Sequence, residues 1–201
     1  MPREQHGTWV RVGTDPPLVV GPGDDPRYAA VSADGRWVVT GREKVGEIKL
    51  WRAADGAFVR RLTPWGTHPR FSPDGRWLAV GGDSGRLYRV DSWEEGTAFQ
   101  GVGSFSPDGA ILFVVSMAGS WQLLDVATGR GLVRVAPPSA EGRQALQAFT
   151  ADGVRLVGVS DATRADLRVW DLRLLRAGLA ERGLDWDAAP LPPRHPDPSC
   201  G

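Results

Sequence analysis

The chain has 201 residues, 41% of them hydrophobic, and its 24 basic residues balance 24 acidic ones. That length is enough for one domain with a sizeable core, and zero net charge gives no electrostatic reason to expect nucleic acid or an anionic membrane as a partner. The single cysteine, Cys200, excludes an intrachain disulfide. No apolar run approaches the ~20 residues that span a bilayer, and the first residues are unlike a signal peptide, so we expect a soluble, cytoplasmic protein.

In chain order, the sequence predicts short β-strands separated by turns rich in Gly, Asp and Pro. Two short strands at 9–12 and 18–20 come first. Four strands joined by tight turns then form a repeat at 28–62, and tight turns require antiparallel pairing. The same order of strands and turns returns in a second repeat at 67–100, a third at 102–135 and a fourth, one strand short, at 146–170.

The pattern changes after the fourth repeat. Strong helix formers run from Leu172 to about Arg182, with Asp171 placed as an N-cap and Gly183 as a stop. Prolines then dominate the end of the chain, which suits a disordered tail. We therefore divide the chain into a repeat domain at 8–171, a helix with a Trp-containing docking segment at 172–187, and a Pro-rich tail at 188–201.

The same kind of turn occurs four times in the sequence. Ser72-Pro73-Asp74-Gly75 has the residue preferred at each position of a type I turn, and related turns carry Asp34, Asp108 and Asp152. The four aspartates could instead bind a metal or act as acids. They lie about 40 residues apart in separate repeats, which favours a structural role. A period near 40 with four strands per period is typical of propeller blades.

The repeats resemble the WD40-repeat β-propeller family. Trp170-Asp171 matches the signature dipeptide, while Trp51-Arg52, Val90-Asp91 and Leu124-Asp125 each keep half of it, and Phe-Ser-Pro-Asp-Gly is the family's usual turn between the first two strands of a blade. The run from Asp171 to Asp187 resembles the end of bacterial, planctomycete-type WD40 proteins, in which a propeller often follows a serine/threonine kinase domain. The resemblance implies an all-β, WD40-like propeller with a short C-terminal helix.

The number of repeats predicts an incomplete propeller of about four four-stranded antiparallel blades. The chain could form an open arc, which we favour, or close as a small ring through its first strands. An open arc leaves sheet edges exposed, so it could recruit missing blades or a protein partner, or self-associate through those edges.

Nine tryptophans are present, and five recur in register with the strands: Trp37, Trp51, Trp77, Trp121 and Trp170. Repetition in register predicts that these five pack in the core. Trp65, Trp93 and Trp186 fall in turns or in the tail, where we expect surface contacts.

No arrangement of residues predicts catalysis, a metal site or a cofactor. The three histidines are scattered in loops without zinc-site spacing, and the Gly-rich run 101–106 lacks the Lys and helix of a phosphate-binding loop. In the resembling family, partners bind loops between successive blades and between second and third strands. By topology, the candidate partner-binding residues are Arg42, Glu43, Lys44, Trp65, His68, Asp83, Ser84, Met117, Asp161 and Arg164.

The sequence therefore favours a non-enzymatic interaction scaffold or sensory module, and it suits a fragment of a larger kinase-linked protein. Two alternatives stay open: a metal-dependent propeller hydrolase or lyase, and a truncated fragment without independent function. A propeller enzyme needs several inward-facing ligands, and this chain has no Asn and no His in its predicted strands.

Overall fold

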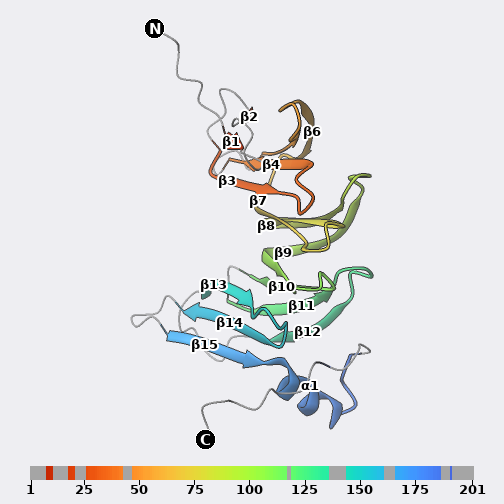
Figure 1. Cartoon of the computed structure of the whole chain (residues 1–201). Helices are drawn as coiled ribbons and strands as arrows, with labels where there is room; N and C mark the ends of the chain where they lie inside the picture. The colour runs from red at the N-terminus through yellow and green to blue at the C-terminus, as the bar shows by residue number, and fades with distance from the viewer. Residues whose placement is uncertain are drawn as a thin grey trace, which may run out of the picture. The chain divides into compact units, whose positions relative to one another are not determined.

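The computed structural model describes residues 8–10, 18–20, 26–42, 47–116, 119–135, 144–160, 166–186 and 191. The chain divides into two compact units, residues 1–140 and 141–201. Both are built from antiparallel sheets, and the fold is an incomplete, propeller-like all-β arrangement with one short helix (Figure 1).

The first unit holds three sheets. Strands β1 (Thr8–Val10) and β2 (Leu18–Val20) pair with each other. Repeat 1 is a four-stranded meander in the order β3-β4-β5-β6. Its strands are β3 (Tyr28–Val31), β4 (Trp37–Gly41), β5 (Ile48–Arg52) and β6 (Phe58–Thr63). All four strands predicted for this repeat are present, and they span residues 28–63 where the sequence predicts 28–62.

Repeats 2 and 3 form one six-stranded sheet, in the order β12-β11-β10-β9-β8-β7. The strands are β7 (Thr67–Phe71), β8 (Trp77–Arg89), β9 (Glu95–Phe105), β10 (Ile111–Val115), β11 (Trp121–Asp125) and β12 (Gly131–Val135). Strand β9 pairs with β8 through its first half and with β10 through its second half. The two repeats therefore share a strand, where the sequence predicts two separate sheets.

Strand β8 contains a hairpin. Its first part, up to Gly81, pairs with β7, and its second part, from Gly82 on, pairs with β9, where the sequence predicts two strands around a loop at Gly81–Gly85. The amide of Val90 donates to the carbonyl of Arg76 (2.9 Å), which ties the two ends of β8 together. The segment therefore doubles back on itself. Backbone pairing continues through it because Gly82, at φ 128°, also pairs with Gly101 of β9.

The second unit contains repeat 4 and the helix. Strands β13 (Gln144–Phe149), β14 (Arg155–Ser160) and β15 (Asp166–Asp171) form a three-stranded sheet. Helix α1 (Leu172–Ala180) follows directly. Asp171 caps it by accepting from the Arg173 amide (3.0 Å), and Gly183 adopts φ 69° just beyond its end. The helix and its N-cap are as predicted, and in the described residues no fourth strand pairs with β15. In the described part of the chain, no helix is long and apolar enough to cross a membrane.

The four repeated turns have a structural role. In each, the Gly amide donates to the carbonyl of the first turn residue, as in Gly75 N to Ser72 O (2.9 Å), and the glycine has φ between 70° and 73°. The Ser72 hydroxyl donates to Asp74 (2.5 Å) and accepts from the Trp77 amide (2.9 Å). The turns at 32–37, 106–111 and 150–155 repeat both contacts, with Thr150 replacing serine in the last. The carboxylates therefore hold the turns closed.

Hydrogen bonds also correct the alignment of the second repeat. Ala53 donates to the carbonyl of Arg36, and Val90 donates in the same way to Arg76. Val90 is thus equivalent to Ala53, which makes Tyr88-Arg89 the counterpart of Trp51-Arg52. The sequence alignment through Val90-Asp91 is wrong by two residues. Tyr88 is only 1% exposed and donates its hydroxyl to the carbonyl of Leu62 (3.2 Å).

In the first unit, the strands of neighbouring repeats pack face to face. Val39, Ile48 and Leu50 of repeat 1 form one buried cluster with Leu78, Val80 and Tyr88 of repeat 2. Ala79 and Leu87, on the other side of repeat 2, form a second cluster with Leu112, Val114 and Leu124 of repeat 3. Within the first unit, the core therefore consists of layers of aliphatic side chains between consecutive repeats.

Acid should destabilise both units. Hydrogen bonds, chiefly from the Ser32 hydroxyl, lower the pKa of Asp34 from its ordinary 3.8 to about 2, and hydrogen bonds from Arg173 lower the pKa of Asp171 to about 2. When the pKa of a carboxylate is lower in the folded state than in the unfolded state, its charged form stabilises the fold. This contribution is complete at a pH above the unfolded-state pKa, and it is lost as the pH falls toward the folded-state pKa. We expect the melting temperature to decrease between about pH 4 and pH 2. Asp171→Asn, which keeps a capping residue, should flatten this decrease in thermal melts of the second unit. An unchanged slope would contradict the assignment.

Candidate functional site

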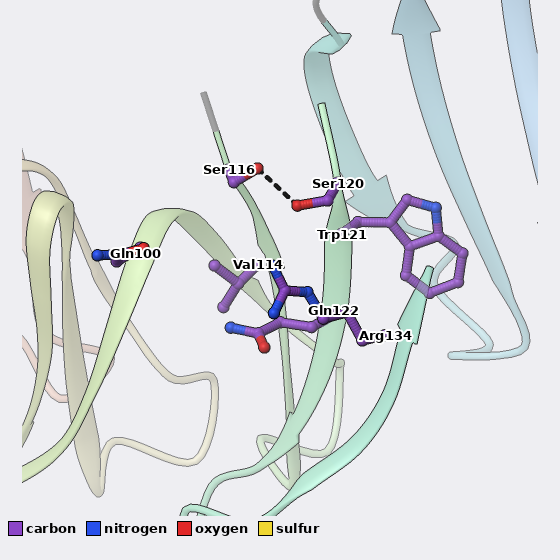
Figure 2. A pocket seen from close by; sticks show the side chains of 7 residues that line it. All are labelled: Gln100, Val114, Ser116, Ser120, Trp121, Gln122 and Arg134. Carbon is purple, nitrogen blue, oxygen red and sulfur yellow. Dashed lines mark hydrogen bonds between the residues drawn. The ribbon is translucent and has the colours of Figure 1, made fainter. Parts of the chain in front are cut away.

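A polar hollow of about 210 Å³ lies on repeat 3, beside the shared strand β9. It is lined by Gln100, Val114, Ser116, Ser120, Trp121, Gln122 and Arg134 (Figure 2). Gln100 immediately precedes the crossover from repeat 2 to repeat 3, and Ser116 and Ser120 flank the turn between the second and third strands of repeat 3. These are the two classes of loop that the sequence resemblance associates with partners.

Strand register places three of these side chains in one row. Val114 on β10 is directly opposite Gln122 on β11, and Gln122 is directly opposite Arg134 on β12. Residues opposite one another across antiparallel strands project from the same side of the sheet. Figure 2 shows the three close together, with the Trp121 ring turned to the other side. Trp121 is 4% exposed and packs against Phe113, with ring centroids 5.5 Å apart. The indole therefore lies on the face of the sheet opposite to the row.

The turn at the rim is held by paired hydrogen bonds. The Ser116 amide donates to the Ser120 carbonyl (2.9 Å), the two hydroxyls are 2.8 Å apart, and Gly119 at φ 82° closes the turn onto Ser116. The two hydroxyls satisfy each other in part, yet each keeps further hydrogen-bonding capacity. The described part of the rim is therefore polar.

The hollow is rich in hydrogen-bonding groups and carries one sign of charge. Among the described residues that line it, Arg134 is the only charged one and none carries a carboxylate. Within the described part of the chain, no ion pair or side-chain hydrogen bond involves Arg134, Gln100 or Gln122. A guanidinium and two amides that are open to solvent can bind carboxylates and backbone carbonyls. Chemically, the site suits a polar or acidic peptide segment.

A second hollow of about 280 Å³ lies where the first strands of repeats 1, 2 and 3 approach one another. Its lining residues are Ala29, Ala30, Pro69, Arg70, Phe71, Pro73, Ser104 and Phe105. Most of these side chains are apolar, and Arg70 is the only charged one among the described lining residues. Elsewhere in the described residues, no three His, Cys, Asp or Glu side chains converge to hold a metal ion.

Of the ten candidate loop residues, the five that the structure describes do not line the polar hollow. Arg42 is exposed after β4, Trp65 is 69% exposed between β6 and β7, and Asp83 and Ser84 are exposed at the point where β8 doubles back on itself. His68 lies in β7 against Tyr28, with ring centroids 4.4 Å apart. The other five, Glu43, Lys44, Met117, Asp161 and Arg164, lie outside the described residues. As partner contacts, all ten stay predictions.

The hollow is formed by residues that the sequence reasoning did not select. Gln122 stands between apolar neighbours in β11, which is a usable signal, because a polar residue inside an apolar strand marks its solvent side. Gln100 and Arg134 carry no such signal; strand register alone brings them beside Gln122.

Two of the three tryptophans expected at the surface are buried. Trp93 is 6% exposed and packs edge-on against Trp37, with ring centroids 5.3 Å apart. Trp186 is 5% exposed beneath the guanidinium of Arg176, which lies 5.0 Å from its ring and also pairs with Asp185. Trp51 and Trp121 are buried as predicted, and Trp37 and Trp77 are partly buried against the core clusters.

Repeated antiparallel sheets with aliphatic layers between them define an all-β, propeller-like repeat protein. No family model matches the sequence, and no curated protein matches it at a significant level. Among solved structures, the chain is similar to hydrazine synthase from Kuenenia stuttgartiensis, a β-propeller-containing protein, at 16% identity with a TM-score of 0.61. The similarity covers 73% of this chain and 46% of that one, so this chain spans less than half of the neighbour's length. At this identity the similarity bears on the fold alone.

Proposed function

We propose that this chain is a non-enzymatic protein–protein interaction module of the WD40-repeat type, acting as a scaffold or sensor in the cytoplasm of a bacterium. The observation that carries the proposal is the polar hollow of repeat 3. It lies at the two loop classes that serve partner binding in the resembling family, and its polar groups are open to solvent. Descent from a larger kinase-linked protein stays a prediction from the C-terminal resemblance.

The row of side chains supports binding rather than catalysis. The Arg134 guanidinium offers several charged hydrogen-bond donors. The side-chain amides of Gln100 and Gln122 can both donate to and accept from a peptide backbone. Catalysis of hydrolysis or elimination needs an acid, base, nucleophile or metal beside the substrate. The described lining contains two hydroxyls that hydrogen-bond each other, and it includes no His, Asp or Glu.

The test is partner capture with a matched pair of variants. Arg134→Gln removes the charge from the hollow, whereas Arg130→Gln removes an exposed charge in the preceding turn that does not line it. Buried interface arginines are frequent hot spots, so we expect at least about a tenfold loss of partner affinity for the first variant and none for the second. Quantitative affinity capture identifies the partner, and titration calorimetry with that purified partner measures the loss.

Two results would contradict the proposal. One is a captured partner whose affinity is the same for both variants, and the other is capture of no specific partner by the wild-type chain. Metal analysis of the purified protein is an independent check, because stoichiometric calcium or zinc would favour the enzyme alternative.

A further inference from the structure

Repeat 2 has an arginine at a position where the other repeats have a small residue. The position is the second before the repeated turn, and in every repeat it lies opposite the third residue of the following strand. It is occupied by Ala30 in repeat 1, Ser104 in repeat 3 and Ala148 in repeat 4. In repeat 2 it is Arg70, whose long charged side chain lines the second hollow.

The backbone just before Arg70 is irregular. His68 and Pro69 form a bulge, because three steps along β7, from Thr67 to Arg70, match only two along β8. His68 adopts φ 49°, which is uncommon for a residue with a side chain and is further disfavoured before a proline. The first strands of repeats 1 and 3 pair with their neighbours without such a shift. Bulges redirect side chains, and strained backbone is concentrated at ligand sites.

Strand register shows what Arg70 faces. Arg70 is opposite Ala79, so both project from one side of repeat 2. Ala79 belongs to the buried cluster between repeats 2 and 3, and Phe105 belongs to the same cluster from the side of repeat 3. Phe71 projects to the other side, where it packs against the cluster between repeats 1 and 2. Both aromatic rings are therefore held in place by the cores between repeats.

The second hollow combines apolar walls with one unpaired cation. Beside the two phenylalanines, the rings of Pro69 and Pro73 line it. Arg70 is the only charged residue among the described lining, and in the part of the chain that the structure describes it has no ion pair or side-chain hydrogen bond. A guanidinium in this setting suits a single carboxylate, which it can bind through two parallel hydrogen bonds. A phosphate would leave a second charge without a partner among these residues.

We propose that the second hollow is a binding site for a small aromatic monocarboxylate. The carboxylate pairs with the guanidinium of Arg70, and the ring lies against Phe71 and Phe105, because flat apolar walls favour a flat apolar ligand. The volume of about 280 Å³ is just below the usual range for ligand sites, roughly 300–1,000 Å³, and so suits a ligand of one or two rings. The site is separate from the proposed partner-binding hollow, since the described linings of the two share no residue.

The first experiment is titration calorimetry of the full chain with two probes, 2-naphthoate and the uncharged 2-naphthamide. The wild type should bind 2-naphthoate at one site, and 2-naphthamide at least about tenfold more weakly. Arg70→Gln should lower the affinity for 2-naphthoate at least about tenfold. Arg130→Gln is the matched control, because Arg130 is exposed in the same unit but does not line the hollow, and it should bind 2-naphthoate like the wild type.

Backbone amide shifts in NMR spectra give a second measurement that depends on no variant. Addition of 2-naphthoate should move the amide signals of Arg70 and Ser104 and leave that of Gln122, in the polar hollow, in place. The proposal is overturned if 2-naphthoate does not bind, if 2-naphthamide binds equally well, if Arg70→Gln keeps the wild-type affinity, or if the shifts occur at Gln122 instead. Because Arg134 does not line the second hollow, any of these results leaves the proposed partner binding testable on its own.

Discussion

Replacing Gly101 with alanine is expected to lower the free energy of unfolding by about 4 kcal/mol or more. Gly101 lies in β9 at the crossover from repeat 2 to repeat 3 and adopts φ 123°, a conformation that residues with a side chain rarely adopt. A Cβ atom there would overlap the carbonyl oxygen of Val115 and lie 2.5 Å from its carbonyl carbon. Both atoms belong to backbone, so neither can move aside without breaking the sheet.

Gly131→Ala is the matched control for Gly101→Ala. Gly131 begins β12 in the same sheet, and a Cβ atom there meets no atom within 4 Å. Alanine at such a position should be neutral or slightly stabilising, because it reduces the freedom of the unfolded chain. Urea denaturation of the two variants measures the difference. Equal stability of both would show that β9 does not pass close to Val115.

Replacing Trp93 with alanine should cost about 3–5 kcal/mol of stability, the usual range for emptying a large aromatic site in a core. Trp93 is 6% exposed and belongs to the cluster between repeats 1 and 2. Removing the indole leaves a cavity beside Trp37, whose ring it contacts edge-on. The expected result is a large decrease in both the melting temperature and the urea midpoint.

Trp65→Ala is the matched control for Trp93→Ala, since it removes the same side chain from a position that is 69% exposed. Its effect on stability should stay within about 0.5 kcal/mol. If the two variants were equally stable, the burial of Trp93 between the repeats would be wrong.

The turns could be predicted from sequence because their chemistry is local. Ser72, Asp74 and Gly75 close their turn through hydrogen bonds between residues at most five positions apart. A short sequence motif therefore contains every group that determines the turn. The N-cap at Asp171 is predictable for the same reason. Strand order within repeats follows, because turns this tight permit only antiparallel neighbours.

Trp93 and Tyr88 were not predictable in the same way. Asp91 and Trp93 adopt positive φ values, 73° and 55°, which redirect the chain after β8 and turn the indole toward the core. Non-glycine residues seldom adopt such values, so the pattern of residue types did not indicate them. The polar hollow could not be predicted because it depends on the register of three strands. That register places Gln122 and Arg134 opposite each other, although they are twelve positions apart in the sequence.

The sharing of β9 has a consequence for how the first unit unfolds. In an array of separate repeats, each one can open while its neighbours stay folded, and stability is nearly a sum of local terms. Here β9 supplies hydrogen bonds to β8 at one end and to β10 at the other. Detaching it disrupts two repeats at once, so repeats 2 and 3 behave as a single cooperative foldon. Repeat 1, whose four strands are its own, can exchange its amide protons independently of them.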